Sequence, residues 1–173
     1  MKNIIFSSII MLIFTGCNSN KEMMKLEKFY VIGIAMESSN ENEKSIEDMG
    51  KLWGRFYSEG ITEKIPNKLS NDIYSIFTDY DSNYKGKYTA IIGHKVSSLE
   101  HIPAGMVSKE IGDGNHVKHI AKGKMPDAIV NAWKEIWSMD SELKRRYTAD
   151  FEVYGKKSQQ GDSSEVEIYL AVE

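Results

Sequence analysis

A glutamate and a tyrosine share one face of a predicted strand near the C-terminus, an arrangement that could bind a cation. Residues 145–155 read RRYTADFEVYG, and side chains alternate between the two faces of a strand. Phe151 and Val153 are therefore expected to form the core face, with Glu152 and Tyr154 on the opposite face. A glutamate placed in this way either faces solvent or lines a cleft. The exposed position is the commoner one, because charged side chains are rarely fully buried.

Hydrophobic periodicity predicts the elements that position this face. A 3.6-residue period indicates one helix over 45–60 and another over 126–138, and each has an apolar stripe that contains a tryptophan, Trp53 or Trp133. Runs rich in β-branched and aromatic residues, bounded by turn residues, predict the strands. These strands are expected at 27–36, 71–80, 86–96, 105–111, 116–121, 146–154 and 165–172.

The order of these elements predicts a duplication. Each half reads strand, helix, strand, strand, and Trp53 and Trp133 lie 80 residues apart at equivalent places in the two helices. We therefore predict an α+β fold in which a duplicated β-α-β-β repeat joins its two sheets edge to edge. Both helices would then cover one face and leave a groove at the pseudo-twofold seam. A seam between repeats is a usual place for a small-molecule site.

The second half also carries short motifs in a recognisable order. They are PAG at 103–105, Gly123, AWKEIW at 132–137, RY at 146–147, DFEVY at 150–154 and VEIY at 166–169. In order and spacing these motifs resemble the GyrI-like family. Within that family they are most similar to the integron-associated effector-binding branch, which is related to the effector-binding domains of AraC- and MerR-type regulators. The resemblance covers about residues 25–173 and is strongest from residue 103 onward.

The resemblance implies an SHS2-like duplicated fold that binds amphipathic or cationic organic molecules in an aromatic groove with a central acidic residue. The groove glutamate of such proteins corresponds to Glu152 in this chain, with Tyr154 beside it. Ala171 stands where relatives usually have proline, and HVKH at 116–119 stands where an aromatic is common. No helix-turn-helix segment precedes the domain, and a role in transcription is therefore not expected.

A groove of this kind has a simple physical basis. A carboxylate in an apolar cleft loses hydration, and its pKa rises unless a cation or hydrogen-bond donors replace the water. A cationic ligand would meet this need, and stacking on aromatic faces would add about 0.5–2 kcal/mol per contact. The expected aromatic wall consists of Trp53, Tyr88, Trp133 and Tyr154. For the two tryptophans a core position is the alternative, because a helix stripe that faces a sheet is usually core.

Two classes of function remain open from the residues. The first is a binding protein for a small organic ligand. The second is a hydrolase of strained small electrophiles, as the resemblance suggests for some relatives, with Glu152 as general base and Tyr154 as hydrogen-bond donor. A protein-binding inhibitor is a third and weaker alternative, because such an inhibitor needs a cytoplasmic partner and the N-terminal segment indicates export.

The N-terminal segment resembles a bacterial lipoprotein signal. Met1 and Lys2 precede an apolar run that is too short to span a bilayer, and Gly16-Cys17 follows it. We expect residues 1–16 to be a signal peptide, 17–25 to be a lipidated cysteine and tether, and 26–173 to be the binding domain. The protein would then be anchored by lipid in the cell membrane or outer membrane, outside the cytoplasm. Cys17 is the only cysteine, so no disulfide is expected in the mature chain.

Charge and motif spacing argue against other classes of site. Without residues 1–16 the chain has 21 basic and 25 acidic residues, interleaved rather than clustered, and nothing suggests a nucleic-acid partner. His116 and His119 fall on opposite faces of a strand, which disfavours a metal site. Residues 79–90 imitate the start of a calcium loop but have tyrosine and alanine at the required glycine and glutamate positions. We therefore expect no cofactor and no metal.

Overall fold

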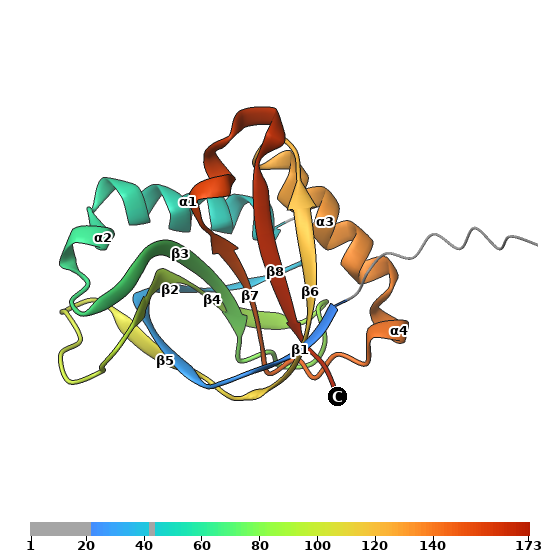
Figure 1. The fold of residues 1–173 in the computed structure, drawn as a ribbon, viewed down its shortest axis with the longest axis horizontal. Coiled ribbons are helices and arrows are strands. Elements are labelled where there is room, and N and C mark those ends of the chain that lie inside the picture. The colour runs from blue at the N-terminus through green and yellow to red at the C-terminus, as the bar shows by residue number, and fades with distance from the viewer. Residues whose placement is uncertain (1–21, 42–43) are drawn as a thin grey trace, which may run out of the picture.

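The computed structural model describes residues 22–41 and 44–173, so Cys17 and the predicted signal peptide lie outside the described residues. One antiparallel sheet in the order β1-β6-β8-β7-β3-β4-β2-β5 organises the described chain (Figure 1). Its strands are β1 (Glu22–Leu26), β2 (Phe29–Ser39), β3 (Lys68–Thr78), β4 (Lys87–Val96), β5 (Val107–Ile111), β6 (Gly114–Lys122), β7 (Ala149–Tyr154) and β8 (Glu165–Ala171). The helices are α1 (Lys44–Ser58), α2 (Ile61–Lys64), α3 (Asp127–Ser138) and α4 (Asp140–Leu143), with 3-10 turns η2 (Lys156–Gln159) and η3 (Gly161–Ser163).

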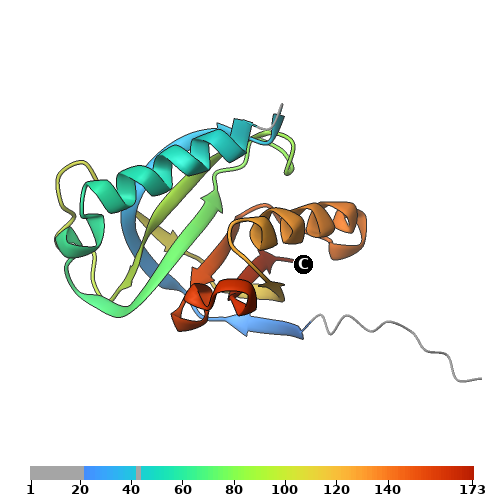
Figure 2. The same cartoon turned by 90° about the horizontal axis from the view of Figure 1, so that it is seen from above.

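The sheet order confirms the predicted duplication. Strands β2, β3 and β4 form one half with α1, and β6, β7 and β8 form the other half with α3. The halves join where β3 pairs antiparallel with β7, and Ser75 lies directly opposite Glu152 at this seam. Phe56 of α1 and Ile136 of α3 belong to the same buried cluster. Both helices therefore cover one face of the curled sheet, as predicted (Figure 2).

Each half receives its outer strand from the other half. β1 precedes the first half in sequence but pairs with β6 of the second half, whereas β5 precedes the second half but pairs with β2 of the first. Residues 22–25 of the predicted tether, 17–25, lie in β1, which begins at Glu22. In this short edge strand Met23 and Lys25 are exposed and Met24 and Leu26 are half-buried, and its pairing partner lies about ninety residues further along the chain.

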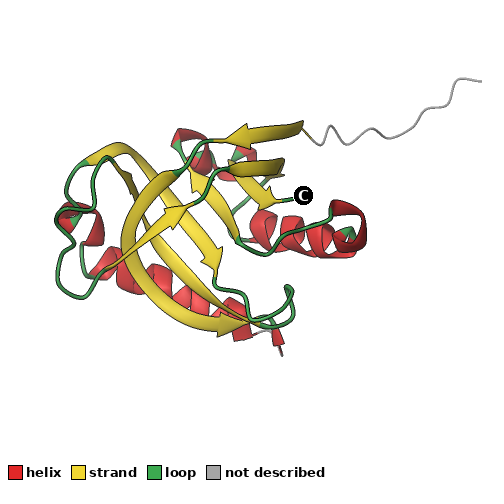
Figure 3. Cartoon of the chain, turned by 90° about the horizontal axis from the view of Figure 1, so that it is seen from below, coloured by secondary structure: helices red, strands yellow, loops and turns green. Residues whose placement is uncertain are grey.

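The sheet is strongly curled (Figure 3). Both of its faces carry buried clusters, and this changes the expected core face of β7. Phe151 and Val153 belong to a smaller cluster on the face away from the helices. Glu152 lies on the helix face, directly opposite Ile168 of β8, where the larger cluster is found. A two-residue period separates the two sets of side chains, but it does not show which set the helices cover.

Two opposed glycines allow a close approach between β2 and β4. Gly33 and Gly93 face each other in the register. A Cβ atom on Gly33 would lie 2.1 Å from the Ile92 oxygen, and one on Gly93 would lie 2.0 Å from the Ile32 oxygen. Any side chain here would therefore force these strands apart. Across residues 22–41 and 44–173, no helix has both the length and the apolar character that crossing a lipid bilayer requires.

Candidate functional site

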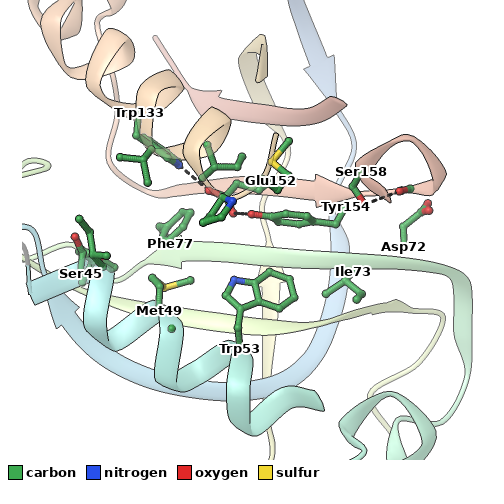
Figure 4. Close-up of a pocket in the computed structure, with 18 of the residues that line it drawn as sticks. Ser45, Met49, Trp53, Asp72, Ile73, Phe77, Trp133, Glu152, Tyr154 and Ser158 are labelled. Atoms are coloured by element: carbon green, nitrogen blue, oxygen red, sulfur yellow. Dashed lines mark hydrogen bonds between the residues drawn. The ribbon is translucent and has the colours of Figure 1, made fainter. Parts of the chain in front are cut away.

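A cavity of about 1000 Å³ lies between the two long helices, above the seam of the sheet (Figure 4). Its walls come from α1 and α3, and its floor includes Glu152 and Tyr154 of β7 and Phe77 of β3. Aromatic side chains dominate the lining. They are Trp53, Tyr57, Phe77, Tyr80, Tyr84, Tyr88, Trp133, Trp137 and Tyr154. All three tryptophans of the chain are among them.

The predicted stripe of α1 is divided between the cavity and the core. Met49 and Trp53 face the cavity, whereas Phe56 is buried against the sheet with Leu52. Tyr57, one turn after Trp53, also lines the cavity and is largely exposed. A helix that packs one edge of its apolar stripe on a sheet leaves the other edge free to form a wall.

The corresponding stripe of α3 is divided in the same way. Ala132 and Ile136 are buried in the core, and Trp133 and Trp137 line the cavity. Trp133 is 9% exposed and therefore serves as both core and wall. The two alternatives considered for this tryptophan in the sequence are thus not exclusive, because its ring packs against Phe77 at 5.2 Å while its indole nitrogen points to Glu152.

Glu152 is buried, with 2% of its surface exposed, at the floor of the cavity. Trp133 Nε1 donates a hydrogen bond of 2.6 Å to Glu152 Oε1, and the Tyr154 hydroxyl donates one of 2.8 Å to Oε2. The buried Ser75 hydroxyl lies directly opposite Glu152 in the register, and it also favours the charged form of this carboxylate. No described lysine, arginine or histidine forms an ion pair with Glu152.

Burial raises the pKa of Glu152, and the hydrogen bonds from Trp133 and Tyr154 oppose this rise only in part. Burial and the adjacent carboxylate raise the pKa of Tyr154 well above its ordinary value, so Tyr154 remains a neutral donor. The site therefore holds a carboxylate whose negative charge is hydrogen-bonded but not neutralised. A cation placed beside such a group would favour its charged form.

The remaining predicted residues surround this carboxylate. Trp53 meets the Tyr154 ring edge to face, with the centroids 4.9 Å apart, and both rings line the cavity. Tyr88 is 4% exposed and packs against Phe77 and Tyr80, each at 5.7 Å, toward another part of the lining. The structure thus places Trp53, Tyr88, Trp133, Glu152 and Tyr154 around one cavity, as Figure 4 shows for those it labels.

The prediction did not include several aromatic residues of the wall. Tyr57 and Trp137 follow Trp53 and Trp133 by four residues, and this helical spacing could have identified them. Tyr84 lies in the turn between β3 and β4 and stacks on Trp137, with centroids 5.6 Å apart and an interplanar angle of 10°. Nothing in the sequence pairs a turn residue with a helix about fifty residues away, so this contact required the structure.

A second buried polar network lies beside the cavity. Arg145 forms an ion pair with Asp150 and a 3.3 Å pair with Asp140, and the Tyr80 hydroxyl donates a 2.8 Å bond to Asp150. The Arg145 guanidinium lies 5.9 Å from the Trp133 ring, but its charge is committed to the two aspartates. Arg145 is therefore paired with these aspartates and forms no ion pair with Glu152.

The histidines that were considered as metal ligands point apart. His116 is buried beside Phe151 on the face away from the helices, whereas His119 lies 3.8 Å from Glu135 of α3. Within residues 22–41 and 44–173, no three histidine, cysteine or acidic side chains are grouped closely enough to hold a metal ion.

Residues 22–172 match the sequence model of the Cass2 family, the integron-associated effector-binding proteins. The chain belongs to this family. The match confirms the resemblance that the motifs of the second half indicated, and it identifies the molecule as an effector-binding domain. The coverage extends from the first residue of β1 almost to the C-terminus, so the whole described fold is the family domain.

Two solved structures share this fold, and one curated protein is similar in sequence. An integron cassette protein from the mobile metagenome of Vibrio cholerae is 25% identical, with a TM-score of 0.70 over 88% of this chain and 95% of its own. SAV2435, solved bound to tetraphenylphosphonium, is 16% identical with a TM-score of 0.73 over 88% and 93%. YobU of Bacillus subtilis (strain 168), named as a candidate transcriptional regulator, is 22% identical over 143 residues, which are 81% of this chain and 89% of YobU.

Proposed function

We propose that this effector-binding domain binds bulky lipophilic organic cations in the cavity between α1 and α3, with Glu152 as the charge-recognising residue. One observation carries the proposal: a carboxylate that is 2% exposed lies at the floor of an aromatic cavity and has no cationic partner among the described residues. The similar fold of SAV2435, which was solved with an organic cation, supports the same class of ligand.

The aromatic wall explains why the ligand would be bulky and apolar. Trp53 on α1 and Trp133 on α3 both line the cavity, and cation–π contacts are strongest with tryptophan. Glu152 already accepts hydrogen bonds from Trp133 and Tyr154, so a cation without N–H donors would suffer no loss of hydrogen bonding there. A ligand of this type brings a positive charge to Glu152 and apolar surface that packs against the aromatic lining.

The geometry favours binding over hydrolysis. A general base needs a free lone pair directed at a water molecule, and a donor must point at the substrate. Tyr154 instead donates to Glu152 itself, and Trp133 holds the other carboxylate oxygen. We therefore treat the hydrolase as an outcome to be tested, by assaying product formation with each compound that binds.

Tryptophan fluorescence gives a direct test, because Trp53, Trp133 and Trp137 all line the cavity. We expect tetraphenylphosphonium to change this fluorescence in a saturable way and to raise the melting temperature of the 22–173 domain. Triphenylphosphine oxide also carries phenyl rings on phosphorus but has no net charge. It serves as the control and is expected to bind more weakly. Equal binding of the two compounds would contradict a role for charge.

Blocking the cavity from α1 is expected to weaken binding irrespective of ligand charge. Gly50 lines the cavity, and a side chain built there meets nothing within 4 Å. Gly50→Trp would fill part of the space and cost the bulky ligand about 1–3 kcal/mol, the scale of overpacking a filled site. Isothermal titration with tetraphenylphosphonium measures this loss.

Gly54 provides the matched control for this substitution. It lies one helical turn further on, a side chain there also meets nothing within 4 Å, and it does not line the cavity. Both substitutions replace an exposed glycine inside a helix, where glycine is unfavourable, so neither is expected to destabilise the fold. If Gly50→Trp and Gly54→Trp bind the cation alike, the ligand lies elsewhere.

We further propose that the domain is anchored by lipid at Cys17, on the outer side of the cytoplasmic membrane or in the outer membrane. The support is the sequence: a short basic start, an apolar run and Gly16-Cys17, ahead of a domain that begins at Glu22. The protein is then expected to fractionate with membranes, and Cys17→Ser is expected to release it or leave it unprocessed. Membrane fractionation and gel mobility measure this result.

A neighbouring substitution controls for changes in the tether. Ser19→Ala alters the same segment without removing the acceptor sulfur, and it is expected to fractionate like the wild type. If Cys17→Ser partitions and migrates as the wild type does, the lipoprotein assignment is wrong.

A further inference from the structure

The two helices that line the cavity differ in the ion pairing and position of their charged side chains. On α1 every charged side chain is paired, by Lys44–Asp48, Glu47–Lys51 and Arg55–Glu59, and none of them lines the cavity. On α3 the cavity-facing stripe contains Val130, Trp133 and Trp137, and it also contains Lys134. A lysine on an otherwise apolar and aromatic stripe is an exception that calls for a reason.

Lys134 has no carboxylate partner among the residues that the structure describes. Its neighbours at helical spacing are Val130, Asn131, Trp137 and Ser138, which cannot form an ion pair with it. The acidic residue next to it, Glu135, faces away from the cavity and lies 3.8 Å from His119. The Lys134 ammonium is exposed and follows directly after Trp133, which binds Glu152. One stretch of α3 therefore supplies both the hydrogen-bond donor to Glu152 and an exposed positive charge at the solvent-facing edge of the lining, which we call the mouth.

A second lysine at the mouth shows the same contrast with its neighbour. Lys156 of η2 lines the cavity and forms no ion pair with a described residue. The next residue, Lys157, lies outside the lining and pairs with Glu165 at 2.9 Å. Asp72 also lines the cavity, beside Gly155, and it partly offsets Lys156. The charged lining thus consists of Glu152 below and Asp72, Lys134 and Lys156 around it.

We infer that the cavity is built for zwitterionic amphipathic molecules, in which an aromatic organic cation carries an anionic group such as a carboxylate. This inference rests on the proposed function, since the cationic part would lie over Glu152. The anionic group would then lie at the mouth, where Lys134 binds it and Lys156 contributes less. A simple monocation leaves Lys134 unpaired and is repelled by it, whereas a zwitterion satisfies both ends of the cavity.

A matched pair of dyes tests this inference. Rhodamine B has a cationic xanthene and a carboxylate, and its ethyl ester has nearly the same shape but only the cation. Fluorescence anisotropy gives the Kd of each dye for the 22–173 domain at low salt. Lys134→Gln is expected to weaken rhodamine B by about two- to fivefold, the scale of an exposed ion pair, and to leave the ester unchanged or slightly tighter. Lys156→Gln is expected to act in the same direction with a smaller effect.

Salt and a neighbouring lysine provide the controls. The loss of affinity caused by Lys134→Gln is expected to shrink in about 0.5 M NaCl. Exposed charges are screened at this salt concentration, which is about three times the physiological ionic strength. Lys157→Gln is expected to leave both dyes unchanged, since Lys157 is paired outside the cavity. A merely structural role of Lys134 would move both dyes in the same direction.

The outcomes separate the two proposals. If both dyes bind and both depend on Glu152, but Lys134→Gln changes them equally or not at all, the zwitterion inference is wrong and the proposed function stands. If neither dye binds, or if neither is affected by Glu152→Gln, the proposed function falls and this inference falls with it. A reciprocal change, weaker for the acid and not for the ester, supports both.

Discussion

Replacement of Glu152 by glutamine is expected to weaken a cationic ligand by about 1.5–3 kcal/mol, the range of an interaction with a charged partner, and not to destabilise the fold. This corresponds to a loss of roughly 10- to 150-fold in Kd. The carboxylate is buried without a cation, so its charge opposes folding and its removal leaves the melting temperature unchanged or higher. Glutamine can keep the polar contacts, because its oxygen accepts from Trp133 and its amide can donate to the Tyr154 hydroxyl.

Glu167 offers a control outside the cavity with the same tyrosine contact, although its side chain is more exposed and lies 3.8 Å from Lys118. Its carboxylate accepts a 2.7 Å hydrogen bond from Tyr169, two residues on, just as Glu152 accepts one from Tyr154. Glu167 lies across from Val153, on the face away from the helices. Glu167→Gln is therefore expected to leave tetraphenylphosphonium binding unchanged.

Three results would give a different account of the Glu152 carboxylate. Equal losses for tetraphenylphosphonium and triphenylphosphine oxide in Glu152→Gln would mean that shape alone governs the site. No loss for either compound would mean that the carboxylate plays no part in recognition. Retained binding with loss of product formation would favour the hydrolase.

The repeat could be predicted because it depends on hydrophobic periodicity within each half of the sequence. Each half has its own helical stripe with a tryptophan, and the strands around it differ in period from the helix. Antiparallel joining of β3 and β7 then follows from packing two similar halves side by side. The pairing of the outer strands could not be predicted in this way. β1 and β5 each pair with the half that they do not precede, and such a long-range exchange has no local signature.

The site was predicted in part for the same reason. Glu152 and Tyr154 share a strand face by simple alternation, and the family resemblance turned that face toward the groove. Alternation alone suggested the wrong core face for β7, because the curled sheet also buries Phe151 and Val153 on its far side. The donor that Trp133 supplies to Glu152 depends on how a helix sits over a seam, and the sequence does not specify this placement.

The affinity for a cation is expected to increase with pH over the acidic range, and Glu152 is expected to be the cause. Burial raises the pKa of Glu152 in the empty cavity, so the group holds its proton above the ordinary glutamate pKa of about 4.3. A cation binds the ionised form and must displace this proton. Below the raised pKa the apparent affinity should therefore fall by up to about tenfold per pH unit, and above it the affinity should level off.

The stability of the ligand-free domain is expected to change with the opposite sign. A carboxyl whose pKa is higher in the folded state binds its proton more tightly there than in the unfolded chain. Its contribution to stability is present below the unfolded pKa and is lost as the pH rises through the folded pKa. Asp48 and Glu165, whose pKa values are lowered, act in the reverse direction. The difference between wild type and Glu152→Gln isolates the one group.

Two measurements across the same pH series test this linkage. Titration calorimetry with tetraphenylphosphonium is expected to show pH-dependent affinity in the wild type and a flat profile in Glu152→Gln. Denaturant unfolding without ligand is expected to show the advantage of Glu152→Gln growing as the pH rises. As the pH rises through the pKa of Glu152, the ligand-free protein loses stability and the affinity for the ligand increases. Both effects come from ionisation of the same buried carboxylate. Parallel pH profiles for the two proteins in both measurements would mean that Glu152 is ionised at its ordinary pKa, and the charge-recognition proposal would lose its physical basis.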